Sequence, residues 1–295
     1  MADILEVYTV NAFVADNQGG NTAGVVLNAD GLKVAQMQRI AADLAFSETA
    51  FVLASKKANF KVKFFTPTEE VKFCGHATVG VFSTLLQTER VEPGQYTQET
   101  KAGVLAVDVA SDGRITMDQA TPQFGEELPA EALAALLGIH PEDILSTGLP
   151  VKVVSTGLAD IIVPVCDEAV LNALQLDFAA ISAFIKKHKA MAIHAFALTP
   201  TESDISARCR NFAPQVGINE ESATGSAAGA LASYLHVYQG GKYRYLFEQG
   251  EILNRRSLLS AKVDSSEQGI ERVTVGGLSD KAQRIPYRLI EEATQ

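Results

Sequence analysis

The chain has 295 residues, of which 47% are hydrophobic and 20% are charged, so it can bury a substantial core and is not expected to be disordered. Its formal net charge is −10, which argues against a nucleic-acid groove because such a groove needs a dense basic surface. The charge does not exclude an anionic small molecule, since backbone N–H groups can bind an anion inside an acidic protein.

Signals for membrane insertion and secretion are missing from the sequence. No apolar stretch approaches the roughly 20 residues that a membrane span needs, and residues 1–4 lack the basic and apolar segments of a secretory signal. The cysteines, Cys74, Cys166 and Cys209, are too few and too scattered for a disulfide framework. We therefore expect a cytoplasmic protein without a membrane partner.

The first half of the chain predicts strands that frame two helices. Hydrophobic residues at near-helical spacing predict a helix over residues 32–45, and an apolar run predicts another over 78–86. Residues 59–65 alternate apolar side chains with lysine, as in a half-buried antiparallel strand. An Asp112-Gly113 pair between two apolar runs predicts a hairpin. The other strands are expected at residues 4–10, 23–27, 50–53, 103–109 and 114–118.

The second half follows a similar plan. Residues 121–128, which include Pro122 and Gly125, are expected to connect two domains. Helices are predicted over 129–137 and over 177–189, the latter capped by Asp177. Strands are expected at residues 160–165, 191–199, 205–212, 243–249, 258–263 and 272–275. Because the strands alternate rather than running continuously apolar, the pattern favours an antiparallel-rich α+β fold.

Two short passages echo each other 150 positions apart. Phe65-Thr66-Pro67 is followed by Cys74-Gly75-His76-Ala77, and Phe212-Ala213-Pro214 is followed by Thr224-Gly225-Ser226-Ala227. Each passage leads into an apolar run that predicts a helix. The repeat suggests two related halves. We expect one domain over residues 1–122 and a second over 123–295, with the last residues packing back on the first domain. The two helix starts would present N–H groups to an anionic small molecule.

Glu48 and His76 are the candidates for acid–base chemistry. Glu48 opens a predicted strand beside apolar Ala50 and Phe51. A carboxyl group partly removed from water holds a proton more readily, which suits it to take and return protons near neutral pH. His76 begins the first apolar helix, where a neutral imidazole could hydrogen-bond a substrate oxygen. The alternatives are a surface glutamate at a helix–strand junction and a histidine that merely caps its helix.

The chain resembles the PhzF-like isomerases of phenazine biosynthesis, which share their fold with diaminopimelate epimerase. Five short motifs in matching order carry the resemblance: Gly20-Asn21-Thr22-Ala23-Gly24-Val25, Phe46-Ser47-Glu48-Thr49-Ala50-Phe51, Phe65-Thr66-Pro67, Cys74-Gly75-His76-Ala77-Thr78 and Glu221-Ser222-Ala223-Thr224-Gly225-Ser226-Ala227. The resemblance implies two similar half-barrels, each around a central helix, with the active site in the cleft between them. It also implies a homodimer that uses no metal or organic cofactor.

The resemblance also implies roles for particular residues. Glu48 would be the general acid/base, His76 would assist it, and Glu221 and Ser226 would orient the substrate. Glu221 stands where similar proteins usually have aspartate, so its longer side chain puts the substrate contact in doubt. A small anionic substrate would further contact residues at the helix starts and in the flanking motifs: Asn21, Ser47, Gly75, Ala77, Thr224 and Gly225.

Other functions remain open from the sequence. Diaminopimelate epimerase uses two cysteines, and the first lies where Cys74 stands here, but its mate in this chain is Thr224. An epimerase that pairs Cys74 with another base is therefore one alternative, and a two-lobed carboxylate-binding protein without turnover is another. A flavin or nicotinamide enzyme is not expected, because no Gly-x-Gly-x-x-Gly spacing follows a strand. A zinc hydrolase is not expected either, because no His-x-x-x-His or comparable ligand pair exists.

Overall fold

The computed structural model describes residues 4–288, and the chain divides into two compact units. The N-terminal unit contains the residues up to 17, residues 21–117 and the residues from 277 onward, whereas the C-terminal unit contains residues 18–20 and 118–276. The domain boundary predicted at residues 122/123 stays a prediction. No helix within residues 4–288 is long and apolar enough to cross a membrane.

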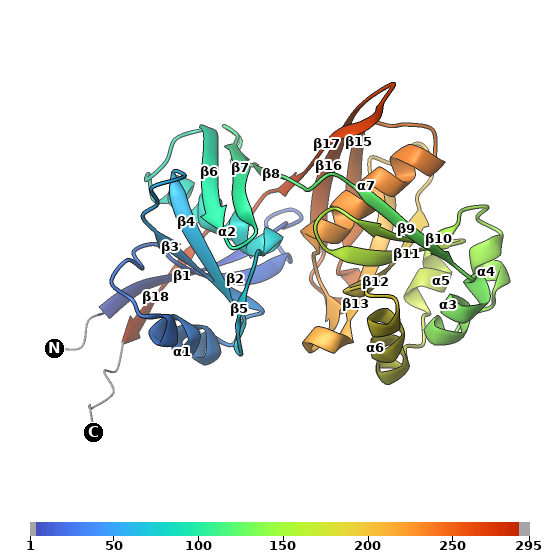
Figure 1. Ribbon diagram of the computed structural model, residues 1–295, viewed down its shortest axis with the longest axis horizontal. Helices are drawn as coiled ribbons and strands as arrows, with labels where there is room; N and C mark the ends of the chain where they lie inside the picture. Colours follow the sequence, from blue (N-terminus) through green and yellow to red (C-terminus); the bar gives the residue numbers. More distant parts are fainter. Residues whose placement is uncertain (1–3, 289–295) are drawn as a thin grey trace. The chain divides into compact units, whose positions relative to one another are not determined.

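A mixed, mostly antiparallel sheet forms the N-terminal unit (Figure 1). β1 pairs with both β18 and β2, and β2 continues through a parallel pairing with β3 to β4. β4 then pairs with β5 and, in parallel, with β6, which leads through β7 to β8. The strands are β1 (Ile4–Ala12), β2 (Asn21–Val26), β3 (Glu48–Leu53), β4 (Phe60–Phe65), β5 (Glu70–Val71), β6 (Gly94–Thr100), β7 (Gly103–Val109), β8 (Ile115–Asp118) and β18 (Gln283–Arg288).

The helices of this unit differ in how they are buried. α1 (Val34–Leu44) is amphipathic and packs Met37, Ile40 and Ala41 into a core cluster with Phe51 and Phe65. α2 (Gly75–Gln87) is buried from His76 to Leu85 and packs on β1, β2 and β3. A helix that is apolar on all sides belongs in the middle of a core. The apolar sequence of α2 therefore makes it the central helix around which the sheet curves.

The C-terminal unit repeats this plan with more helices. Its sheet runs β9-β10-β11-β12-β13-β15-β16-β17, with parallel pairings at β11–β12 and β13–β15 and a short β14 beside β13. The strands are β9 (Gln123–Leu128), β10 (Val151–Ser155), β11 (Ala159–Val165), β12 (Ala192–Leu198), β13 (Ala207–Ala213), β14 (Ile218–Glu221), β15 (Arg244–Gln249), β16 (Ser257–Ser266) and β17 (Gly269–Gly277). α3 (Ala130–Leu137), α4 (Glu142–Leu145), α5 (Glu168–Asn172) and α6 (Phe178–Lys187) pack into one core cluster with this sheet.

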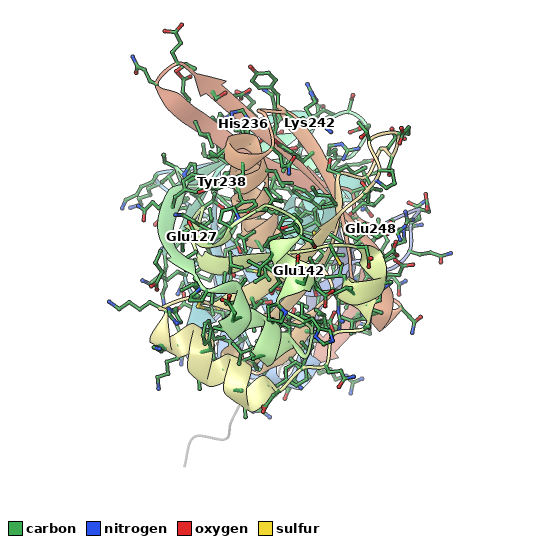
Figure 2. The ribbon with its side chains drawn as sticks, turned by 90° about the vertical axis from the view of Figure 1, so that its right-hand side faces the viewer. Glu127, Glu142, His236, Tyr238, Lys242 and Glu248 are labelled. Atoms are coloured by element: carbon green, nitrogen blue, oxygen red, sulfur yellow. The ribbon has the colours of Figure 1, made fainter. Side chains whose placement is uncertain are left out.

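α7 (Gly225–Tyr238) is the central helix of this unit and packs on β10, β11, β15 and β16. It is buried from Ala227 to Leu235. Figure 2 shows His236, Tyr238 and Lys242 together near its C-terminal end. There the His236 Nδ1 donates to the carbonyl oxygen of Lys242 at 2.9 Å, which ties the helix end to the loop before β15.

Most of the predicted elements are confirmed, and their bounds shift by a few residues. The Asp112-Gly113 hairpin joins β7 to β8 with Gly113 at φ +85°, and Asp177 caps α6 by accepting from Ala179 N and Ala180 N. Within the predicted connection 121–128, the residues from Gln123 form the strand β9, which pairs with β10 and was not predicted. The strands β5, β6, β10, β14 and β18 and the short helices α4 and α5 were not predicted.

Candidate active site

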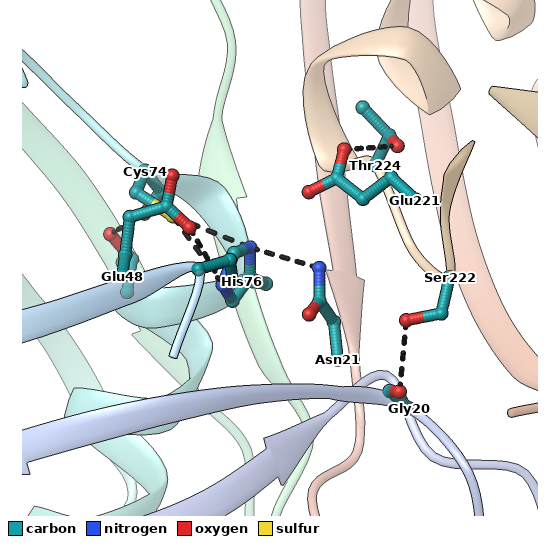
Figure 3. A network of polar contacts seen from close by, with 10 residues as sticks. Gly20, Asn21, Glu48, Cys74, His76, Glu221, Ser222 and Thr224 are labelled. Carbon is teal, nitrogen blue, oxygen red and sulfur yellow. Dashed lines mark hydrogen bonds and ion pairs between the residues drawn. The ribbon is translucent and has the colours of Figure 1, made fainter. Parts of the chain in front are cut away.

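Glu48 and His76 meet in the N-terminal unit (Figure 3). Glu48 is the first residue of β3 and lies beside Ala23 of the parallel strand β2, while His76 is the second residue of α2. Their side chains approach with Glu48 Oε2 at 3.2 Å from His76 Nε2. The imidazole is 4% exposed and the carboxylate 14%. Glu48 is therefore largely covered and in contact with His76, and its role as the base stays a prediction.

The other predicted groups of this unit surround the same imidazole. Ser47 Oγ lies 3.2 Å from Nε2, and Asn21 Nδ2 lies 3.4 Å from Nδ1. Cys74 Sγ is 3.4 Å from Nδ1 and 3.8 Å from Nε2. Three motifs that are separate in the sequence thus converge on His76. The N-cap position belongs to Cys74, so His76 does not cap α2.

The start of α2 adds a positive electrostatic environment. The first bond within the helix runs from Thr78 N to the carbonyl oxygen of Cys74, at 3.1 Å. The N–H groups of Gly75, His76 and Ala77 therefore point along the helix axis away from the helix body, where they favour negative charge. This end of α2 combines a carboxylate, an imidazole and backbone donors, which is a set that can bind an anionic group and move a proton.

The predicted residues of the C-terminal unit also lie together. Glu221 ends β14, and its Oε2 accepts a 2.6 Å hydrogen bond from Thr224 Oγ1. Gln249 Nε2 donates to the Glu221 carbonyl oxygen at 2.7 Å and to Thr224 Oγ1 at 3.1 Å. Gly225 and Ser226 lie in the first turn of α7, whose N-cap is Thr224. Figure 3 shows the Glu221–Thr224 contact.

A buried polar group near Glu221 was missed by the sequence analysis. Asp160 at the start of β11 is 2% exposed, and burial, followed by the negative charge of Glu221, raises its pKa well above the ordinary value. Nearby in the same sheet, His194 of β12 faces Asn211 of β13, with 3.2 Å between His194 Nδ1 and Asn211 Nδ2. Burial lowers the pKa of His194 to about 3, so it stays neutral. A single acid leading into the apolar run Ile161 to Val163 was the signal that could have revealed Asp160.

One group of side chains could also hold a metal ion. Glu48, Cys74 and His76 each offer a donor atom, and these atoms lie within 4.8 Å of one another. The sequence analysis found no ligand pair because these donors come from two segments that only the fold brings together.

The two units, each a sheet around a buried helix that begins beside polar groups, define an α+β protein. The family model of the phenazine biosynthesis-like proteins, PhzC-PhzF, matches residues 10–282. The chain belongs to this family.

Individual relatives agree with that assignment. An uncharacterised isomerase of Clostridium acetobutylicum is 34% identical, with 92% of this chain and 94% of the relative covered. The trans-2,3-dihydro-3-hydroxyanthranilate isomerase of Pseudomonas chlororaphis is 31% identical, with 91% and 94% covered. The crystal structure of a PhzF-family phenazine biosynthesis protein from Bacillus anthracis superimposes with a TM-score of 0.86 at 30% identity, covering 96% of this chain and 99% of the other. These similarities confirm the predicted fold and the isomerase class.

Proposed function

We propose that this isomerase moves a proton between two carbon atoms of a small, unsaturated, carboxylate-bearing substrate, with Glu48 as the single base. The contact between Glu48 Oε2 and His76 Nε2, at 3.2 Å beside the start of α2, is the observation that carries this proposal. A carboxylate with one oxygen held by an imidazole is oriented for proton transfer.

The reaction needs no other reactant. Glu48 removes a proton from a carbon activated by a neighbouring double bond or carboxylate, and the electron pair of that C–H bond moves into the unsaturated system. Negative charge then develops on a substrate oxygen, where the N–H groups of Gly75 and His76 would stabilise it. Glu48 returns the proton to another carbon on the same face, so a new C–H bond forms and the carboxylate is regenerated.

His76 orients the base in this scheme. With Nδ1 accepting from Asn21 Nδ2 (3.4 Å), Nε2 carries the ring proton and lies 3.2 Å from both Glu48 Oε2 and Ser47 Oγ. Because the orientation of an Asn amide and the tautomer of a His are assigned from their neighbours, this tautomer follows from the hydrogen-bond geometry. In the C-terminal unit, Glu221 and Ser226 stay the predicted substrate-orienting residues.

The substrate class rests on the relatives. One of them is named for an isomerisation of trans-2,3-dihydro-3-hydroxyanthranilate, which is an unsaturated ring acid. We propose that this chain acts on an acid of the same kind. Glu221 in place of the usual aspartate lengthens one side chain by a methylene, which would favour a substrate of different size at that position.

Replacement of the base tests the proposal. Glu48→Gln keeps the size of the side chain but removes its basicity, so turnover of a substrate that the wild type isomerises should fall by about 10²–10⁴-fold. Glu131→Gln on the exposed side of α3 is the matched control and should keep full activity. Full turnover by Glu48→Gln would overturn the proposal.

A thiol-dependent epimerase is the second candidate, because Cys74 Sγ lies 3.4 Å from His76 Nδ1. A thiol–imidazole pair can exchange a proton with a substrate carbon. Cys74→Ser separates the two mechanisms: it should abolish thiol-based chemistry and leave glutamate-based isomerisation largely intact.

A further inference from the structure

Three different donor types meet at the start of α2. Glu48 contributes a carboxylate oxygen, Cys74 a sulfur and His76 a ring nitrogen, and one atom of each lies within 4.8 Å of the others. Cys74 is 8% exposed and His76 4%. Such a mixed, largely buried set differs from an acidic surface cluster because sulfur and imidazole select the metals that bind them.

We propose that Glu48, Cys74 and His76 form an inhibitory binding site for Zn²⁺ or a cation of similar softness. Zinc accepts sulfur, imidazole and carboxylate ligands together, and sites with three protein ligands keep a fourth position for water. Mg²⁺ and Ca²⁺ take oxygen ligands and would be bound poorly by this set. The proposal concerns an ion that blocks the enzyme and not a cofactor.

The distances between the donor atoms fit such an ion after small movements of the side chains. His76 Nε2 lies 3.2 Å from Glu48 Oε2 and 3.8 Å from Cys74 Sγ. In a tetrahedral zinc site with metal–ligand bonds of about 2.0–2.3 Å, neighbouring donor atoms are separated by roughly 3.3–3.6 Å. Nε2 would therefore bind the ion between its two neighbours, and Ser47 Oγ, 3.2 Å from Nε2, would give up that contact.

The neighbour of the other ring nitrogen supports the tautomer that zinc requires. When Nε2 binds a metal, Nδ1 carries the proton and needs an acceptor. The side-chain amide of Asn21 lies 3.4 Å from Nδ1. Rotating this amide by about 180° exchanges its nitrogen and oxygen and would place the oxygen there as the acceptor. At Nδ1, the ordinary state and the metal-bound state thus differ only in the orientation of this amide.

Inhibition follows from the identity of the ligands. The proposed base, Glu48, would be occupied by the ion, so it could not accept a proton from substrate. This inhibitory part rests on the proposed function, but binding of the ion does not. Metal binding also requires the Cys74 thiolate, so one proton is released from the thiol as the sulfur–metal bond forms.

Cobalt spectroscopy tests the site without any substrate. Metal-stripped protein titrated with Co²⁺ should give one equivalent per chain with a thiolate-to-cobalt charge-transfer band and the visible bands of a tetrahedral ion, and Zn²⁺ should displace it. Cys74→Ser should remove the charge-transfer band and weaken Zn²⁺ binding by more than about 100-fold. This loss exceeds the one expected from mutating a residue that only hydrogen-bonds a metal ligand. Cys166→Ser, which alters an exposed cysteine of the C-terminal unit, is the matched control and should leave both unchanged.

The outcomes separate the two proposals. A wild-type spectrum without a thiolate band, or a band that survives Cys74→Ser in a variant whose circular dichroism shows it folded, overturns the metal site. Glu48→Gln should weaken Zn²⁺ binding by at least about 10-fold. If Glu48→Gln retained turnover while Co²⁺ still bound through Cys74, the proposed function would fail and the metal site would stand.

Discussion

Each unit buries an imidazole, but the side chains that contact the two imidazoles differ. In the N-terminal unit His76 lies 3.2 Å from the carboxylate of Glu48, whereas in the C-terminal unit His194 faces the amide of Asn211. Without an acidic partner, burial lowers the pKa of His194 to about 3. The first imidazole is thus placed to exchange or share a proton, while the second is held neutral.

The two central helices begin in the same way and differ in the groups they present. α2 follows Cys74 and starts Gly75-His76, and α7 follows Thr224 and starts Gly225-Ser226. A histidine replaced by a serine exchanges a titratable group for a hydroxyl that cannot act as a base near neutral pH. Under the proposed function only the start of α2 takes part in proton transfer, and the following experiments test that asymmetry.

Among variants that keep Glu48, the largest effect is expected at the two helix starts. His76→Gln removes the imidazole that orients Glu48 and should lower kcat by about 100-fold, within the range for assisted acid–base catalysis. Ser226→Ala should change KM by less than about 10-fold and barely alter kcat. The substitution removes a hydroxyl that would contact the substrate, but it removes no group that transfers a proton. Steady-state kinetics on both variants measure this. Equal losses in kcat would contradict a single proton-transferring end.

The next effect is on acid stability and concerns His194. Its folded pKa of about 3 lies below the unfolded value near 6.5, so the unfolded chain binds more protons and stability is lost as pH falls from 6.5 toward 3. Between pH 6 and pH 4.5 this group should cost about 2 kcal/mol. Urea denaturation of His194→Gln should show a shallower pH dependence, while exposed His140→Gln should match the wild type. An unchanged slope would mean that His194 is not held neutral.

A smaller, opposite effect is expected for Asp160. Its folded pKa is raised, so the folded chain holds a proton that the unfolded chain releases, and stability falls as pH rises above about 4. Asp160→Asn imitates the protonated acid and should be more stable than the wild type at pH 8, with the gain vanishing below pH 4. Thermal unfolding at several pH values measures the difference. Exposed Asp108→Asn serves as the control.

The smallest effect is expected for Glu221→Asp. The shorter side chain should lose the 2.6 Å contact with Thr224, which Gln249 still holds in place. We expect a change in KM of a few fold, of the order of one hydrogen bond, and a shift in preference between substrates of different size. A collapse of kcat would instead make Glu221 a second proton carrier and contradict the one-base scheme.

The sequence predicted the local features well, because they depend on short patterns. The apolar run after His76 predicts a buried helix, and Asp112-Gly113 predicts its hairpin, without reference to the rest of the chain. The position of Glu48 at the beginning of a strand was predicted in the same way.

What the sequence did not predict depends on distant pairing. β18 joins β1 across about 280 residues, and its alternating segment has little apolar character by itself. Glu48 lies close to Cys74 and His76 because β3 pairs with β2 and α2 packs on both strands. No short sequence pattern could have predicted this group of side chains. Asp160 begins β11, which lies between β10 and β12, so its burial depends on this strand pairing and not on a local spacing of residues.

The face of proton delivery tests the central claim most directly. Isomerisation in D₂O of a substrate whose two faces are distinguishable, followed by NMR of the product, locates the incorporated deuterium and the side from which it arrived. A single glutamate predicts removal and delivery on one face, with incorporation lost in Glu48→Gln. Delivery on the opposite face would require a second proton carrier and would contradict the account.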